Sequence, residues 1–269
     1  MTGRKLSRRL SFGALFVPVV AWMCYLFLLL PSTIVFPISF GNTKEMEFPP
    51  SEWSLDLYRQ FFNDSAWWGA MTQSLFIATV TTVFTAVLSV PAVYALQRAR
   101  LPMSSALTHF TMGPLLVPVI VLALGLYLQW APWGGLDRNL TLVLSHTMLA
   151  TPFMMISVGA SLRHVDPALE NAALIMGASK VRIFFRVVLP QLKSGIAAGS
   201  LFAFLISLDE VIVAYFVTGP ETETLPVKMY SAIRWEVSPV IAAVSTLLTV
   251  VSMALAVALM MLERKQRSE

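Results

Sequence analysis

The chain alternates long apolar segments with short polar stretches that carry most of its charged residues. An α-helix needs about 20 predominantly apolar residues to cross a bilayer, and six segments reach that length. They are Leu10–Phe36, Gly69–Leu96, Ala106–Leu128, Leu140–Leu162, Gly195–Val217 and Pro239–Leu262. The pattern predicts an all-α integral membrane protein, with six transmembrane helices in a single domain over residues 1–269.

Composition and charge support this class and orient it. Hydrophobic residues make up 57% of the chain and charged residues 13%, against about 45–50% and about 25% in soluble domains. Lysine and arginine gather on the cytoplasmic side of membrane proteins. One side of the six segments holds Arg4, Lys5, Arg8, Arg9, Arg98, Arg100, Arg163, Lys180, Arg182, Arg186, Lys193, Arg264, Lys265 and Arg267, and the other side holds Lys44, Arg59, Arg138, Lys228 and Arg234. Both termini and the loop near residue 180 are therefore expected to be cytoplasmic.

The outer loops carry the aromatic residues of a membrane surface. Ser54–Phe62 predicts a short amphipathic helix in the first outer loop. Tryptophan is enriched at membrane–water interfaces. We therefore interpret the outer-loop tryptophans as an interfacial belt rather than a surface that stacks on a ligand; they are Trp53, Trp67, Trp68, Trp130 and Trp133.

A polar-flanked stretch, about residues 166–190, interrupts the second half of the chain. Asp166 and Pro167 suit the N-cap and first position of a helix. Gly177 suits a helix stop because glycine tolerates the left-handed conformation, and Ser179 is placed to cap a second helix. This predicts a helix–turn–helix between two spans, which could rest on lipid headgroups or bind a partner.

The fifth segment combines a small-residue face with two adjacent acids, Asp209 and Glu210. Gly195, Gly199, Ala203 and Ser207 recur every four residues, which lets helix backbones approach closely in lipid. An ionisable acid inside a membrane is energetically unfavourable, so its side chain faces a cavity or a partner. The two carboxylates predict a site for an organic cation, and an interhelical anchor is the alternative.

The stretch around residue 177 resembles the EAA loop of ABC importer permeases. Asn171-Ala172-Ala173, Gly177 and Leu189-Pro190 match the order and spacing of that motif. Asn171 stands where glutamate is usual and Val187 where isoleucine is usual, but Glu170 lies one place upstream. The resemblance implies that this loop couples the permease to an ATPase, through Asp166, Glu170, Asn171, Ala172, Ala173, Gly177, Leu189 and Pro190.

The following stretch, residues 207–248, resembles the second permease type of spermidine/putrescine importers. Its landmarks are Ser-Leu-Asp-Glu from Ser207, Phe-Val-Thr-Gly-Pro from Phe216 and Leu-Pro-Val-Lys from Leu225. The resemblance implies the type I importer permease fold and a polyamine as cargo. Asp209 and Glu210 would then hold the amine nitrogens in transit.

The resemblance also implies partners and a location. A second, homologous permease, two cytoplasmic ATPases and an extracytoplasmic substrate-binding protein are expected, in a bacterial inner membrane. The sequence has no Walker-type loop, so ATP and magnesium are expected on the ATPases and this chain is expected to be no enzyme. No metal site is expected, because His109, His146 and His164 show no ligand spacing. Nucleic acid is not an expected partner.

The sequence leaves other functions open. Importers of gamma-aminobutyrate, opines, phosphonates or iron share the permease architecture. An ion-gradient-driven transporter could use intramembrane acids, but it needs no structured cytoplasmic loop, and the chain shows no obvious inverted repeat. A membrane-embedded enzyme would need a nucleophile or metal cluster, which the sequence does not show.

Overall fold

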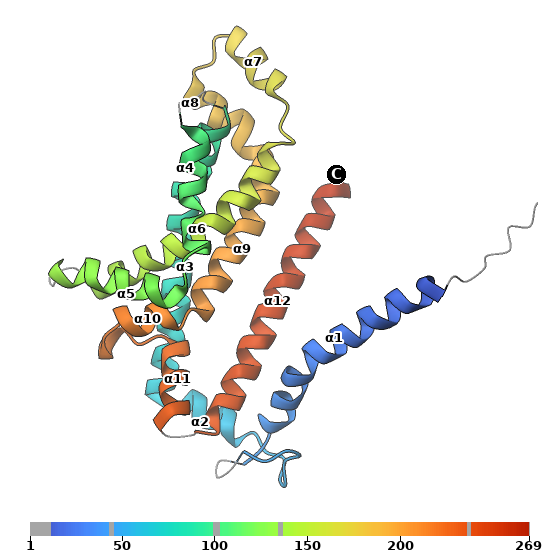
Figure 1. Ribbon diagram of the computed structural model, residues 1–269, viewed down its shortest axis with the longest axis vertical. Coiled ribbons are helices and arrows are strands. Elements are labelled where there is room, and N and C mark those ends of the chain that lie inside the picture. Colours follow the sequence, from blue (N-terminus) through green and yellow to red (C-terminus); the bar gives the residue numbers. More distant parts are fainter. Residues whose placement is uncertain (1–11, 43–45, 99–102, 134–136, 236–237, 269) are drawn as a thin grey trace, which may run out of the picture. The chain divides into compact units, whose positions relative to one another are not determined.

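The computed structural model describes residues 12–42, 46–98, 103–133, 137–235 and 238–268, and within these ranges it is helical without a strand (Figure 1). The chain divides into two units. Unit 1 comprises residues 1–61 and 238–249, and unit 2 comprises residues 62–237 and 250–269. The single permease domain inferred from the sequence stays a prediction.

Unit 1 contains α1 (Phe12–Ile38) and most of α2 (Asp56–Asn63). Side chains of the connection between α1 and α2 contact these helices. The Ser39 hydroxyl and the Tyr58 hydroxyl lie 2.7 Å apart, and the Phe40 ring packs beside Tyr58. The short amphipathic helix predicted over Ser54–Phe62 is confirmed by α2, although α2 begins two residues later.

Three long helices form the bundle of unit 2: α3 (Ser65–Arg98), α6 (Arg138–Leu162) and α9 (Lys193–Asp209), each packed against the other two. The predicted small-residue face of α9 is confirmed, because Gly195, Gly199, Ala203 and Ser207 are all buried. A Cβ atom on Gly195 would lie 2.5 Å from the Ser161 Cβ atom of α6. The two helices are therefore in contact at a distance that only glycine permits at this position.

Two of the expected spans are not continuous helices. Residues 104–133 form α4 (Ser104–Thr111), the 3-10 turn η1 (Gly113–Leu115), α5 (Val119–Trp130) and η2 (Ala131–Trp133). Pro118 lacks a backbone N–H and precedes α5, which explains the break. Likewise α9 ends at Asp209, and α10 (Ile212–Val217) follows as a separate helix. The predicted segments Ala106–Leu128 and Gly195–Val217 are thus each built from shorter helices.

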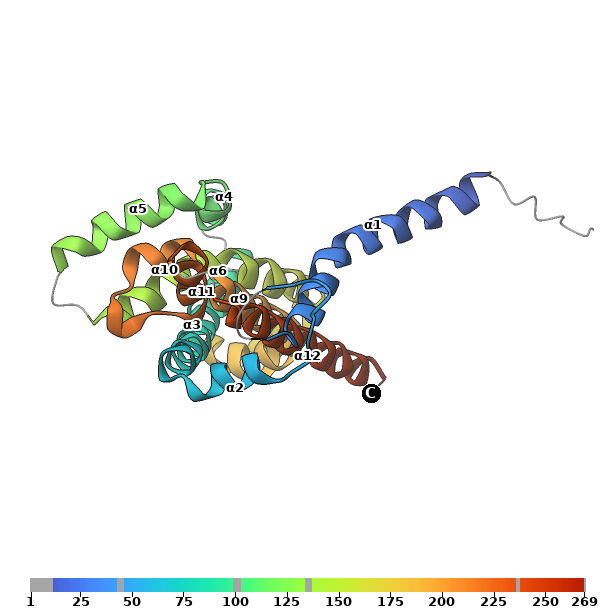
Figure 2. The same ribbon diagram turned by 90° about the horizontal axis from the view of Figure 1, so that it is seen from below.

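The two short helices α5 and α10 lie side by side at one flank of unit 2 (Figures 1 and 2). Val213, Ala214 and Val217 of α10 share a buried cluster with Ala123 and Leu126 of α5. Each broken segment thus buries its apolar face against the other.

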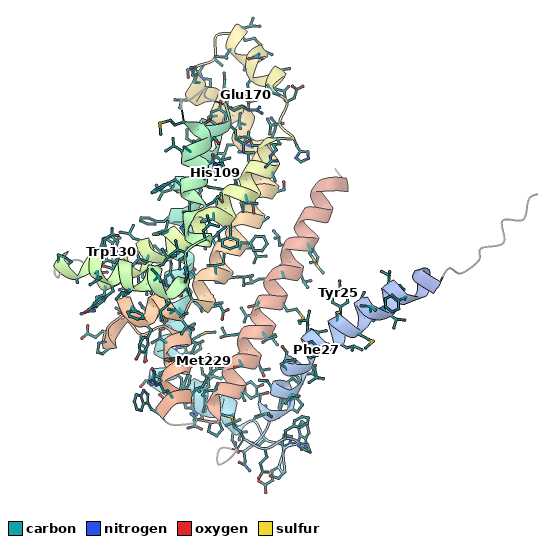
Figure 3. All side chains as sticks on the ribbon, viewed as in Figure 1. Tyr25, Phe27, His109, Trp130, Glu170 and Met229 are labelled. Atoms are coloured by element: carbon teal, nitrogen blue, oxygen red, sulfur yellow. The ribbon has the colours of Figure 1, made fainter. Side chains whose placement is uncertain are left out.

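The chain next forms η5 (Pro220–Thr222) and α11 (Leu225–Trp235), which packs against α3. Trp67 is only 4% exposed, and Lys228 of α11 lies over its ring at 5.9 Å. Trp67 is therefore buried within unit 2, and its place in a membrane-surface belt stays a prediction. Trp130 is half-buried and donates a hydrogen bond to Ser145 (Figure 3).

The last helix is α12 (Val240–Ser268). Five helices of the described chain are long and apolar enough to cross a membrane: Phe16–Ile38, Ser65–Arg98, Arg138–Leu162, the helical run Lys180–Asp209, and Val240–Met261. The prediction of an all-α membrane protein is confirmed.

The close contact between α9 and α6 generates a stability prediction. Gly195→Ala places a methyl group against Ser161 and within 2.8 Å of the Ser157 carbonyl oxygen. Overpacking of this kind costs about 1–3 kcal/mol, so the thermal midpoint of the purified protein in detergent should fall. Gly69→Ala is the control, because nothing lies within 4 Å of its added Cβ. Equal midpoints for the two variants would contradict the packing argument.

Candidate functional site

The 166–190 segment is the helix–turn–helix that the sequence predicts. It contains α7 (Pro167–Ile175), α8 (Lys180–Ile183), the π-helical turn η3 (Phe184–Val188) and the first residues of the 3-10 turn η4 (Leu189–Leu192). The Asp166 carboxylate accepts a hydrogen bond from the Ala168 N–H at 2.8 Å, and the Ser179 hydroxyl accepts one from the Arg182 N–H. Both predicted N-caps are confirmed.

Gly177 ends α7 in the predicted left-handed conformation, with φ +83°. The Gly177 N–H donates to the Leu174 carbonyl at 2.9 Å, and the Ala178 N–H donates to the Ala173 carbonyl at 3.0 Å. This pair of hydrogen bonds is the Schellman motif, which satisfies carbonyls that the end of a helix leaves free. The turn between α7 and α8 therefore depends on a residue that tolerates positive φ.

The outer surface of the 166–190 segment is apolar where α7 meets α8. Ile175 is 88% exposed, Met176 80% and Val181 68%. Asn171 and Ala172 are exposed as well, whereas Ala173 is buried. A cluster of large exposed apolar side chains on a capped, ordered hairpin is typical of a surface that binds another protein.

Leu189 and Pro190 lie on the helical run that leaves the 166–190 segment. Leu189 is half-buried and packs against the main core cluster of unit 2. Pro190 is exposed and occupies an early position of η4, where its missing N–H is tolerated. The run continues without interruption through η3, η4 and α9 to Asp209, so α8 of the hairpin and Asp209 share one helical run.

Glu170 points into unit 2 rather than away from it. It is 8% exposed, and it lies on α7 beside the end of α3 (Figure 3). Its Oε1 atom lies 2.9 Å from Arg98 Nε, and its Oε2 atom accepts a hydrogen bond from the Tyr94 hydroxyl at 2.8 Å. Oε2 is thus hydrogen-bonded to α3, and Oε1 is buried and faces Arg98 as an ion pair without a hydrogen bond in the described chain.

The two acids of the fifth segment, although adjacent, have different surroundings. Asp209 is the last residue of α9 and is exposed. Over the ranges that the structure describes, its carboxylate has no hydrogen-bond or ion-pair partner. Within the described chain it is therefore an unpartnered carboxyl group at the end of a helical run that is long and apolar enough to cross a membrane.

The Glu210 carboxylate is bound to the start of α10. Its Oε1 atom accepts hydrogen bonds from the Ile212 and Val213 N–H groups at 3.1 and 3.0 Å. Its Oε2 atom accepts one from the Ala214 N–H at 2.9 Å. These N–H groups have no partner within a helix that begins at Ile212, so Glu210 supplies the cap that the helix break requires.

A third polar residue, His146 of α6, completes this site. It is 1% exposed, and its Nδ1 atom lies 2.8 Å from the Ser207 hydroxyl. Its Nε2 atom faces Glu210 Oε2 at 3.7 Å, beyond hydrogen-bond distance. Sequence reasoning missed this residue, because a single histidine in an apolar helix carries no spacing signal.

Comparison with known proteins places the chain. Residues 92–267 match the family of binding-protein-dependent transport system inner membrane components. The chain belongs to this family. The putrescine transport system permease protein PotI of Escherichia coli K12 is 30% identical over 86% of this chain and 84% of its own length. The spermidine/putrescine transport system permease protein PotC of the same strain is 29% identical over 89% of this chain and 90% of its own length.

Solved structures of the same fold agree with the family. A bacterial ABC transporter involved in the import of the acidic polysaccharide alginate has a chain that superposes with a TM-score of 0.70 at 16% identity, covering 96% of this chain and 98% of its own. The alginate transporter in complex with an alginate-bound periplasmic protein gives a TM-score of 0.67 at 18% identity, over 94% of this chain and 93% of its own. The chain is therefore a multi-pass inner membrane permease component with the fold of importer membrane subunits.

The capping role of Glu210 generates the second prediction. Glu210→Ala removes acceptors from the start of α10, and loss of an N-cap costs about 1–2 kcal/mol. The thermal midpoint of purified Glu210→Ala should fall below that of the wild-type protein. Glu210→Gln keeps one acceptor oxygen, so its midpoint should lie between those of wild type and Glu210→Ala. Asp209→Ala is the matched control, because its carboxylate accepts no hydrogen bond within the described chain. A larger fall for Asp209→Ala than for Glu210→Ala would rule out the capping role.

Proposed function

We propose that this chain is a permease subunit of an ABC importer that carries a polyamine, a spermidine- or putrescine-like organic cation, into the cytoplasm. The observation that carries the proposal is the unpartnered, exposed carboxylate of Asp209 at the end of α9, within the described part of the chain. A carboxylate within a membrane-spanning bundle needs a compensating ligand or water, and a protonated amine is a ligand of the right sign. The similarity to PotI and PotC supports the same cargo.

The proposed assembly contains the partners that such an importer needs. They are a second, homologous permease, two cytoplasmic ATPases that bind ATP and magnesium, and an extracytoplasmic substrate-binding protein. The charge asymmetry of the sequence supports an orientation with both termini and the 166–190 segment in the cytoplasm. Several charges behind this argument, including Arg4 and Arg100, lie outside the described residues.

In this proposal the 166–190 segment seats in a cleft of an ATPase subunit. Asp166, Gly177 and Ser179 shape the hairpin, and Asn171 and Ala172 lie on its exposed surface with Ile175 and Met176. Ala173, Leu189 and Pro190 support the hairpin from within or from the following turn. ATP-driven closure of the ATPases would move this surface.

Movement of the hairpin would be transmitted to the acid pair through the helical run that connects them. The helical run from Lys180 to Asp209 contains 30 residues without a gap, and it passes through the π-helical turn η3 and the 3-10 turn η4 before α9. Its first turns belong to the hairpin, and its last residue is Asp209. A tilt imposed at the cytoplasmic end would therefore reposition the carboxylate at the other end, which is the change that alternating access requires.

Within the acid pair, the two carboxylates contribute differently to the proposed cargo site. Asp209 is free to contact an amine nitrogen. Glu210 accepts hydrogen bonds from the first turn of α10 and so caps that helix. Its carboxylate also adds negative potential next to Asp209. A single mobile contact holds a cation weakly, and weak holding allows release.

Removal of the Asp209 charge tests the cargo site. Asp209→Asn keeps the size of the side chain but loses the charge, and a hydrogen bond to a charged group contributes about 1.5–3 kcal/mol. Uptake of labelled putrescine or spermidine per assembled complex should fall about ten- to a hundredfold. Glu52→Gln removes an exposed carboxylate outside the helices and should transport normally. Normal uptake by Asp209→Asn, at normal complex yield, would refute the role of Asp209 in binding polyamines.

The turn at Gly177 tests the coupling role. A β-branched residue resists positive φ, so Gly177→Val should displace α8 and the surface around Ile175, and uptake and cargo-stimulated ATP hydrolysis should fall together. Gly177→Asn should lose less activity, because asparagine tolerates the left-handed region. The measurement is both rates in proteoliposomes that contain the whole complex. If valine and asparagine behave alike and near wild type, the hairpin has no coupling role.

A further inference from the structure

We infer that Tyr94 and Arg98, at the end of α3, are positioning residues that hold the coupling hairpin through Glu170. The inference rests on the proposed coupling role of the 166–190 segment. It assigns Glu170 a partner inside the permease, whereas the sequence had placed it among the residues that contact an ATPase.

The ion pair is the centre of this arrangement. Arg98 Nε lies 2.9 Å from Glu170 Oε1, and the side chains of both residues are largely buried. The Tyr94 hydroxyl donates to the other oxygen at 2.8 Å. Glu170 is only 8% exposed, and its buried Oε1 atom relies on the Arg98 ion pair, so the carboxylate is not placed to bind a second protein.

Arg98 also binds the connection between α6 and α7. Its Nη2 atom donates to the Val165 carbonyl at 2.6 Å, and the Leu162 carbonyl lies 3.4 Å away. These carbonyls lie at the end of α6 and just beyond it, and the Leu162 carbonyl also accepts the Val165 N–H. One guanidinium group thus joins α3, the end of α6 and α7.

Tyr94 extends the attachment to the other half of the hairpin. Its ring packs against Phe184 of η3, with 5.1 Å between the ring centroids. The same side chain therefore contacts α7 through its hydroxyl and η3 through its ring. The two halves of the hairpin are both fixed to a single turn of α3.

This attachment has a mechanical consequence. Movement of α7 away from α3 would leave a buried guanidinium and a buried carboxylate unpaired, and each unpaired charge is strongly unfavourable. The end of α3 should therefore move together with the hairpin. Force from the ATPases would enter the bundle at two points, α9 through the continuous helix and α3 through Glu170.

A double-mutant cycle tests this pairing in the whole complex. Glu170→Gln and Arg98→Met should each leave the other partner stranded and lower putrescine transport per ATP hydrolysed about tenfold. The double variant leaves no charge stranded, and neutral replacement of a whole buried pair is well tolerated. Transport per ATP should therefore recover to within about threefold of wild type. Tyr94→Phe should show a smaller loss than either charge variant.

The matched control is the exposed pair of α2, Arg59 and Asp56, whose side chains are 73% and 52% exposed. Arg59→Met and Asp56→Asn should leave transport per ATP unchanged, because exposed pairs contribute little. Wild-type behaviour of Arg98→Met, or a double variant no better than its worse parent, would overturn the inference. The second result would indicate that Glu170 has a partner outside this chain.

Ile175→Asp separates this inference from the proposed function. It places a charge on the exposed apolar surface of the hairpin, which should abolish co-purification of the ATPases. Retained ATPase binding would refute the coupling role of the hairpin and the inference with it. Lost binding, combined with wild-type behaviour of Arg98→Met and Glu170→Gln, would refute the inference alone.

Discussion

Backbone N–H groups inside a membrane need partners, and this constraint explains the arrangement around the acid pair. The break between α9 and α10 leaves the N–H groups of Ile212, Val213 and Ala214 without partners inside a helix, because they belong to its first turn. Glu210 binds all three. The same break makes Asp209 the final residue of its helix, with a carboxylate that nothing in the described chain engages. One backbone requirement thus gives two neighbouring acids opposite roles.

Local chemistry made much of this structure predictable. The caps at Asp166 and Ser179 and the turn at Gly177 follow from how single residues satisfy or orient a neighbouring backbone. The small-residue face of α9 follows from helical spacing. Each of these signals is contained within a few residues, so the sequence displays it directly.

The features that the sequence did not reveal depend on contacts between distant residues. Hydropathy treats Ala106–Leu128 and Gly195–Val217 as spans, because a break in a helix does not change its composition. The breaks are stabilised by the packing of α5 on α10 and by Glu210, which only the tertiary structure shows. The pairing of Glu170 with Arg98 joins helices far apart in the chain. For the same reason, the sequence showed that Glu170 lies one place upstream of the motif's usual glutamate but could not show its partner.

We proposed that movement of the ATPases is transmitted to the bundle through both α9 and α3, and this affects how the cargo site would open. If only α9 moved, it would slide along α6 at the contact where Gly195 and Gly199 leave no spare space. A closely packed contact of that kind resists sliding. Movement of α3 together with the hairpin would let α3, α6 and α9 tilt as one body, since Arg98 also binds the carbonyls at the end of α6. In that arrangement the glycine contacts stay intact, and the conformational change falls at the breaks before α5 and α10, where the backbone already departs from a continuous helix.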